Sequence, residues 1–191
     1  MDLLKLLNDA NFVHSQQVAK ISEMMAEKAG YSQPEIKMIS QAALFHDIGK
    51  AAIPLVILNK PSALTPDEYE IIKTHTAVGC KQITEAIQIL TVAAILAQQH
   101  HEHAGSGLGY YRMAGADIHP YAKLVAVADV YDALVARRPY KAPWCAEKVK
   151  GYFTEQSGKQ FEPEMVTILF GIWDEVQALH TNIILVEDNV K

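Results

Sequence analysis

The sequence is poor in cysteine, lacks an excess of positive charge and has no long apolar run. Its 191 residues include two cysteines, Cys80 and Cys145, whose separation excludes a CxxC motif. We therefore expect two reduced thiols in a cytoplasmic protein, with one disulfide as the alternative. The net charge of −5 disfavours a nucleic-acid duplex as partner. The negative net charge does not exclude a small anionic substrate, because bound cations reverse the local electrostatic field inside a binding site.

Membrane insertion is disfavoured by the length of the apolar runs. The most apolar stretch, AIQILTVAAILA at 86–97, is about half of the ~20 residues that a membrane-spanning helix needs. The first residues, MDLLKLLNDANF, are too short and too interrupted by charge for a signal peptide. We therefore expect a cytoplasmic chain without membrane insertion. Its length and apolar content fit one globular domain with a sizeable core.

Helical periodicity dominates, and the alternation typical of strands is absent before the last ten residues. SQPE (32–35) and TPDE (65–68) are helix start signals, and Gly30 is a stop signal. We predict an all-α fold with an irregular or short-helical connection over 49–63. The expected helices cover about 12–29, 33–47, 65–75, 83–101, 120–135, 145–156 and 162–179.

The chain is expected to form one domain over 1–180, followed by a tail over 181–191. The tail contains IILVEDN, which resembles the first strand and acidic turn of a response-regulator receiver domain. Two interpretations of the tail stay open. It is either the truncated start of such a domain, or a frayed end or edge strand.

The segment LFHDIGK (44–50) combines a histidine, a carboxylate and a lysine. If the helix over 33–47 continues, His46, Asp47 and Lys50 share the stripe of its apolar residues and point inward. An ionised carboxylate in the interior is costly unless it is paired or bound to a metal. A buried His–Asp hydrogen bond, with Lys50 reaching solvent, is the structural alternative.

Other ionisable residues repeat this pattern. His14 shares a helix face with Val18 and Ile21, and His75 is on the inward side of its helix. Asp129 and Asp132 share one face of YAKLVAVADVYDALVA (121–136), which is apolar nearly all round. Capping cannot offset a carboxylate in the middle of a helix, whereas a cation can.

Together these residues predict a buried metal centre. Seven imidazole and carboxylate groups exceed the four ligands of a structural zinc site and suit two transition ions, with Fe or Mn favoured and Zn, Ni or Co open. Two metals about 3.5–4 Å apart bind phosphate oxygens and bridge an attacking hydroxide. Glu102 is expected to orient an imidazole. The candidate ligands are His14, His46, Asp47, His75, His100, His101 and Asp129.

The order H…HD…H…HHE…D, with FHDIGK and VADVYDAL, resembles the HD-GYP branch of the HD metal-dependent phosphohydrolases over residues 11–180. The resemblance implies an all-α HD-domain bundle with a buried Fe or Mn centre that hydrolyses cyclic di-GMP to pGpG or GMP. It makes the seven residues metal ligands, Asp47 a bridging, catalytic ligand and Lys50 a catalytic contact to phosphate. Trinuclear members carry a glutamate four residues before the first histidine; Ala10 stands there in this chain, so two ions are expected.

The same resemblance names candidate substrate contacts. RRPYK (137–141) matches the family's DRPYK, so Arg138 and Lys141 are candidates for phosphate or guanine contacts. The family's HHExxDGxGYP reads HHEHAGSGLGYY here, so Tyr110 or Tyr111 is a candidate replacement for its tyrosine. Asp132 completes this set, which also includes Lys50.

The alternatives are a different cyclic dinucleotide or nucleotide phosphate as substrate, and a non-catalytic messenger-binding module. A homodimer, and a regulatory domain that is fused or separate, are the partner hypotheses.

Overall fold

Residues 9–86, 91–136 and 142–179 are described by the computed structural model, and their regular elements are helices joined by turns and loops. No β-strand occurs among them, apart from an isolated bridge between Ser157 and Phe161. The all-α expectation is confirmed. In chain order the elements are α1 (Asp9–Lys28), α2 (Gln33–Ala43), η2 (Ile48–Ala52), α3 (Leu55–Leu58), α4 (Pro66–Ala86), α5 (Thr91–Gln99), η3 (Gly115–Asp117), α6 (Pro120–Val135), α7 (Ala146–Gln156) and α8 (Pro163–Gly171).

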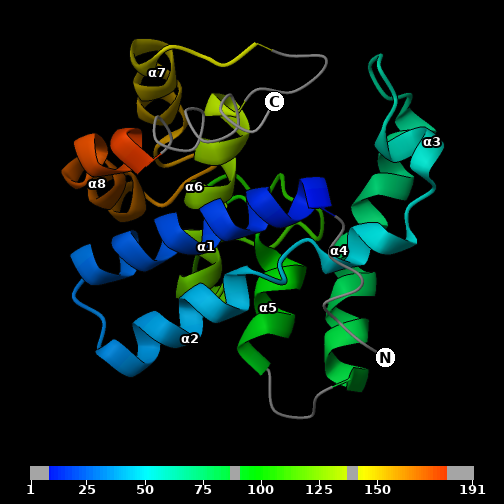
Figure 1. Ribbon diagram of the computed structural model, residues 1–191, viewed down its shortest axis with the longest axis horizontal. Helices are drawn as coiled ribbons and strands as arrows, with labels where there is room; N and C mark the ends of the chain where they lie inside the picture. The colour runs from blue at the N-terminus through cyan, green and yellow to red at the C-terminus, as the bar shows by residue number, and fades with distance from the viewer. Residues whose placement is uncertain (1–8, 87–90, 137–141, 180–191) are drawn as a thin grey trace.

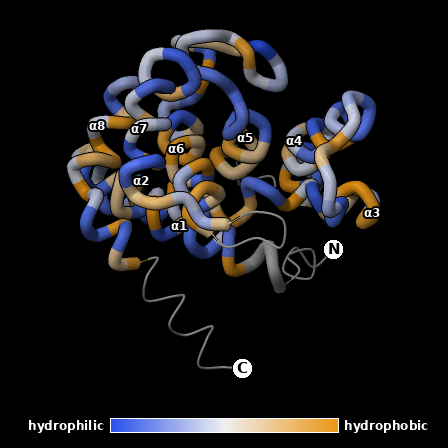
Figure 2. Tube along the Cα trace, turned by 90° about the horizontal axis from the view of Figure 1, so that it is seen from above, coloured by the Kyte–Doolittle hydropathy of each residue, from blue (hydrophilic) through white to orange (hydrophobic). Residues whose placement is uncertain are grey.

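Helix α6 is the centre of the bundle. α1 runs across the molecule and packs against α2 and α6, whereas α4 stands at the far end against α5 (Figure 1). The residues Leu124, Val125 and Val127 of α6 are fully buried, as expected for a helix that is apolar nearly all round. Seen from above, α3 lies at one edge of the molecule and carries an apolar turn (Figure 2), with Val56 80% exposed.

Both predicted helix start signals form capping boxes. The backbone N–H of Ser32 donates to Glu35 Oε2 at 2.9 Å. At the start of α4, the Thr65 N–H donates to Glu68 Oε2 at 2.7 Å, and the Glu68 N–H donates back to Thr65 Oγ1 at 3.2 Å. These reciprocal bonds satisfy N–H groups that a helix leaves unpaired at its first turn.

The predicted helix over 33–47 is too long, because α2 ends at Ala43. The chain continues through a turn over 44–47 whose N–H groups bond three residues back, as from His46 to Ala43. The backbone leaves the helix here because it passes directly against α4. A Cβ on Gly49 would lie only 1.9 Å from the carbonyl oxygen of His75. His46 and Asp47 nevertheless face inward, with 0% and 5% of their surfaces exposed.

Two further helix boundaries differ from the prediction. α4 extends past His75 to Ala86, so the helix predicted from 83 begins instead at Thr91 and ends at Gln99. Glycine is tolerated inside α4 because Gly79 packs against the Gly49 backbone. The helix predicted over 162–179 is interrupted at 172, where the N–H bonds three residues back, and helical backbone resumes over 173–179.

Further expectations concern the cysteines, membrane insertion and two segments of the chain. Cys80 and Cys145 form no disulfide with each other. Among the described helices, none combines the length and the apolar character needed to cross a bilayer. The predicted tail, 181–191, and the RRPYK segment, 137–141, lie outside the described residues.

Candidate metal centre

Seven histidine and aspartate side chains meet in the interior, and they are the seven that the sequence predicted as ligands. They form two groups, and within each group the candidate ligand atoms lie within 4.8 Å of one another. One group consists of His14, His46 and Asp129; the other consists of Asp47, His75, His100 and His101.

Three helices and two turns supply these side chains. α1, α4 and α6 contribute His14, His75 and Asp129. The turn after α2 places His46 and Asp47 side by side, and the turn after α5 does the same for the pair at 100–101. Segments far apart in the sequence therefore converge in a bundle in which α6 packs against α1 and α5, and α5 packs against α4 (Figure 1).

Asp47 lies between the two groups. Its Oδ2 is 3.3 Å from His46 Nε2 and 3.7 Å from His14 Nε2. Its Oδ1 is 3.3 Å from His75 Nε2 and 3.7 Å from His100 Nε2. The two carboxylate oxygens therefore face different groups, which is the arrangement that a carboxylate bridging two cations needs.

Backbone carbonyl groups orient three of the imidazoles. Each Nδ1–H donates to a carbonyl oxygen three or four residues earlier, which turns Nε2 toward the cluster and leaves it free to ligate. The pairs are His46 with Ala43 at 2.8 Å, His75 with Ile72 at 2.6 Å, and His100 with Leu96 at 2.9 Å.

The cluster contains buried polar atoms without hydrogen-bond partners. Among the described residues these include Nε2 of His46, His75 and His100, and Oδ1 of Asp47. An unsatisfied buried group costs about 1–3 kcal/mol, so four of them at one point require compensation. Imidazole nitrogen and carboxylate oxygen are donors that divalent transition ions accept, and the residues present therefore fit such ions.

The charges of the cluster support one another. Burial alone would raise the pKa of Asp47, but Lys50 and His46 hold it well below its usual range. Likewise, burial opposes ionisation of Asp129, yet its contacts with His14 and His46 keep the pKa low. Burial lowers the pKa of His46, whereas without a metal the two carboxylates outweigh burial and raise it to about 10, so a metal that binds at Nε2 displaces a proton. Both carboxylates are therefore ionised and available as ligands.

Asp132 is buried beside the centre and contacts one of the candidate ligands. Its Oδ2 accepts a hydrogen bond from His14 Nδ1 at 2.6 Å, and only 1% of the residue is exposed. His14 Nε2 in turn lies 3.1 Å from Asp129 Oδ1. Asp132 therefore orients His14, because the two aspartates lie one turn apart on α6 with the histidine between them, and its expected contact to a substrate stays a prediction.

Glu102 also has a different role from the expected one. It is buried, and its carboxylate accepts the backbone N–H groups of Tyr111 and Met113, both at 2.8 Å. A Cβ on Gly109 would lie 2.7 Å from its Oε2. Glu102 therefore fixes the loop that follows the histidine pair, whereas carbonyl groups perform the imidazole-orienting role predicted for it.

We expect Glu102→Gln to loosen this loop and to leave the metal content unchanged. The neutral amide group offers one accepting oxygen instead of two, so one backbone N–H loses its acceptor and the other loses a charged partner, at a cost of about 1.5–3 kcal/mol. Urea denaturation measures the loss, and exposed Glu155→Gln is the matched control. Loss of bound metal at unchanged stability would instead make Glu102 a ligand.

The base of the same loop is fastened to the turn between α7 and α8. The N–H of Ala104 donates to the carbonyl of Gln160, and the N–H of Gly105 donates to that of Lys159, both at 2.9 Å. The two backbones cross so closely that a Cβ on Gly105 would lie 2.0 Å from the Gly158 oxygen. The loop therefore has one attachment at Glu102 and another at the α7–α8 turn.

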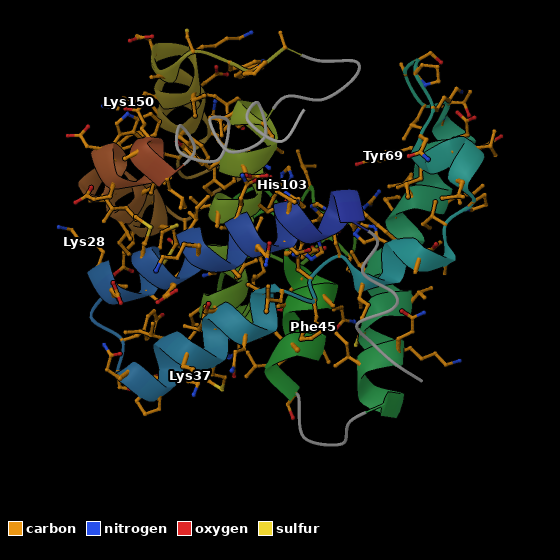
Figure 3. The ribbon with its side chains drawn as sticks, viewed as in Figure 1. Lys28, Lys37, Phe45, Tyr69, His103 and Lys150 are labelled. Carbon is orange, nitrogen blue, oxygen red and sulfur yellow. The ribbon has the colours of Figure 1, made fainter. Side chains whose placement is uncertain are left out.

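The tip of the loop brings aromatic side chains to the cluster. The Tyr110 ring centroid lies 4.7 Å from that of His101, and burial raises the pKa of its hydroxyl. The Tyr111 hydroxyl is 2.9 Å from Thr76 Oγ1 on α4. His103, labelled in Figure 3, belongs to neither group of candidate ligands; its Nδ1 lies 3.2 Å from Ser106 Oγ.

The candidate phosphate contacts are only partly described. The Lys50 ammonium donates directly to Asp47 Oδ2, and its side chain is 22% exposed. Arg138 and Lys141 lie in the segment outside the described residues.

Comparisons with known proteins find an HD domain and relatives that are named phosphodiesterases. A family model described as HD domain matches residues 1–165. The chain is 38% identical to the 3'3'-cGAMP-specific phosphodiesterase 2 of Vibrio cholerae, over 89% of this chain and 33% of the relative. It is 39% identical to a cyclic di-GMP phosphodiesterase of Thermotoga maritima, over 87% of this chain and 46% of the relative. The chain thus spans less than half the length of these curated relatives.

A solved structure shares the fold. Bd1817, an HDG"Y"P protein from Bdellovibrio bacteriovorus, superposes with a TM-score of 0.70 at 23% identity. The match covers 85% of this chain and 52% of that chain.

Proposed function

The chain belongs to the HD-domain family, and from this premise we propose that it is a metal-dependent phosphodiesterase of the HD-GYP type. The proposed reaction is hydrolysis of a cyclic dinucleotide, with cyclic di-GMP favoured and pGpG or GMP as product. The observation that carries the proposal is the pair of neighbouring groups of candidate ligands. Seven buried or half-buried side chains converge there, and four of their nitrogen and oxygen atoms have no hydrogen-bond partner among the described residues.

HD-domain phosphohydrolases are metal-dependent, and we assign two ions, Fe or Mn, to this chain. When bound, the ions would lower the pKa of water and polarise phosphate oxygens. Asp47 would contact both ions, because its oxygens face both groups. The first ion would be held by His14, His46 and Asp129, and the second by His75, His100 and His101.

The side chains around the ligands would bind and orient the substrate. Lys50 is placed to neutralise a phosphate oxygen, because its ammonium lies at the carboxylate shared by both groups and is partly exposed. Asp132 and the carbonyl groups hold the imidazoles in place before substrate arrives. Tyr110 lies beside His101 and would contact the nucleotide.

A second substrate, 3'3'-cGAMP, is supported by a specific observation. The V. cholerae relative at 38% identity is named for that substrate. The loop of this chain also lacks the family's DG and YP pairs, so the element expected to contact the nucleotide differs from the family pattern.

A substrate screen with metal analysis tests the proposal. Protein reconstituted with Mn or Fe is assayed against cyclic di-GMP, 3'3'-cGAMP and nucleoside monophosphates, with chelated protein as control. We expect about two metal equivalents and cleavage of a cyclic dinucleotide. Cleavage of the monophosphates alone would contradict the proposed substrate class. Less than one equivalent, without cleavage, would favour a messenger-binding module.

Two further proposals concern the domain organisation and the assembly of the protein. We assign 1–180 to the phosphohydrolase domain and 181–191 to a tail, and we propose a homodimer controlled by a fused or separate regulatory domain. Light scattering of the purified chain measures the oligomeric state.

A further inference from the structure

A row of aromatic rings leads from the metal centre to the surface of α4. The His101 and Tyr110 ring centroids are 4.7 Å apart, and the Tyr110 and Tyr69 centroids are 6.0 Å apart with the planes at 89°. We call these three side chains the aromatic row. Its inner end belongs to a candidate metal ligand, and its outer end, Tyr69, is 47% exposed.

The row is held in place from both sides. Tyr110 is fixed through its neighbours, because Glu102 binds the Tyr111 N–H and the Tyr111 hydroxyl contacts Thr76. Tyr69 is on the first turns of α4, the helix that carries His75, and Figure 3 shows its position there. An exposed ring is therefore presented at a fixed place near the candidate ligands.

A cation accompanies the exposed end. Lys73 Nζ lies 5.7 Å from the Tyr69 ring centroid and 2.7 Å from Glu70 Oε1. Lysine donates to the O6 and N7 acceptors of guanine. Every nucleobase has a face that stacks on aromatic side chains, whichever base it is.

We propose that Tyr69 is a substrate-binding residue that stacks on a nucleobase of the cyclic dinucleotide while the scissile phosphate lies at the metal centre. Tyr110 forms the inner part of the same surface, and Lys73 faces the edge of the base. The inference rests on the proposed function, since it names the residue that recognises the base. It differs from a purely structural role, in which Tyr69 would only pack against the loop.

The test compares Tyr69→Ala and Tyr69→Phe in the full chain loaded with metal. We expect Tyr69→Ala to bind cyclic di-GMP about tenfold more weakly, because one stacking contact is lost, while Tyr69→Phe keeps its ring and stays within about twofold. In turnover assays KM rises by the same factor and kcat is unchanged. Metal content stays that of the unmodified chain, which a disturbed ligand set would not allow.

The matched control is Tyr31→Ala, at the turn between α1 and α2, where the ring packs on Tyr121. Thermal melting confirms that each variant folds. Equal dissociation constants for Tyr69→Ala and the unmodified chain would overturn the inference even if the enzyme is active. A Phe variant as weak as the Ala variant would also overturn it, because the hydroxyl and not the ring would then be the contact.

Equilibrium dialysis with cyclic di-GMP separates this inference from the proposed function. If the unmodified chain binds the nucleotide but cleaves no cyclic dinucleotide, the proposed function fails and the binding comparison still decides the role of Tyr69. If the unmodified chain binds neither cyclic di-GMP nor 3'3'-cGAMP in the same dialysis, both are overturned.

Discussion

Asp47→Ala is expected to lower the rate of cyclic dinucleotide hydrolysis at least about a hundredfold and to release metal from both groups. Loss of a partner that only orients a ligand already costs about 10–100-fold in affinity or activity, and Asp47 is itself a candidate ligand to both ions. Its oxygens lie 3.3 Å from one imidazole of each group, so a single truncation affects both.

Elemental analysis and the turnover rate, measured on the same preparations, check this result. Metal also stabilises the fold to which it binds, by about 2.7 kcal/mol at a hundred times its dissociation constant. We expect the variant to lose this metal-dependent rise in melting temperature. Asp117→Ala, an exposed carboxylate on η3, is the matched control. Wild-type turnover by Asp47→Ala would show that the two-metal mechanism is wrong.

Lys50→Ala is expected to lower kcat by about 10²–10³, as loss of one preorganised group that stabilises transition-state charge does elsewhere, with metal content nearly intact. The ammonium group lies at Asp47 Oδ2 but belongs to neither group of candidate ligands. In the metal-bound protein, the cations would take over the neutralisation of Asp47. Lys50 would then be free to contact a phosphate oxygen.

Lys37→Ala on the exposed side of α2 is the control for the lost charge (Figure 3). Rates and metal content are measured together across a range of substrate concentrations. If Lys50→Ala lost metal in proportion to activity, Lys50 would act by holding Asp47 and not by binding phosphate.

The cluster of candidate ligands could be predicted from sequence because several of its members violate a local rule. Asp129 stands in a helix that is apolar nearly all round, and His14 shares its face with core residues. Such positions require compensation wherever the helices pack. His46 and Asp47 were predicted to face inward from a helix that ends before them, and they are buried because the tight turn after α2 keeps them in the interior.

The remaining features depend on contacts between distant segments. The end of α2 is set by the crossing of Gly49 over the His75 carbonyl, which no local pattern reveals. Glu102 was assigned to an imidazole because its neighbours are histidines, whereas its partners are nine and eleven residues away. Tyr69 gave no signal in the sequence, since an exposed aromatic residue near a helix start has no periodicity to mark it.

The crossing of Gly105 with Gly158 ties the α7–α8 turn to the loop that follows the histidine pair. Because backbone hydrogen bonds join the two segments, a displacement of the turn also displaces the loop that carries Tyr110. A molecule bound at this turn, which contributes no candidate ligand, would therefore move the loop without contacting the cluster.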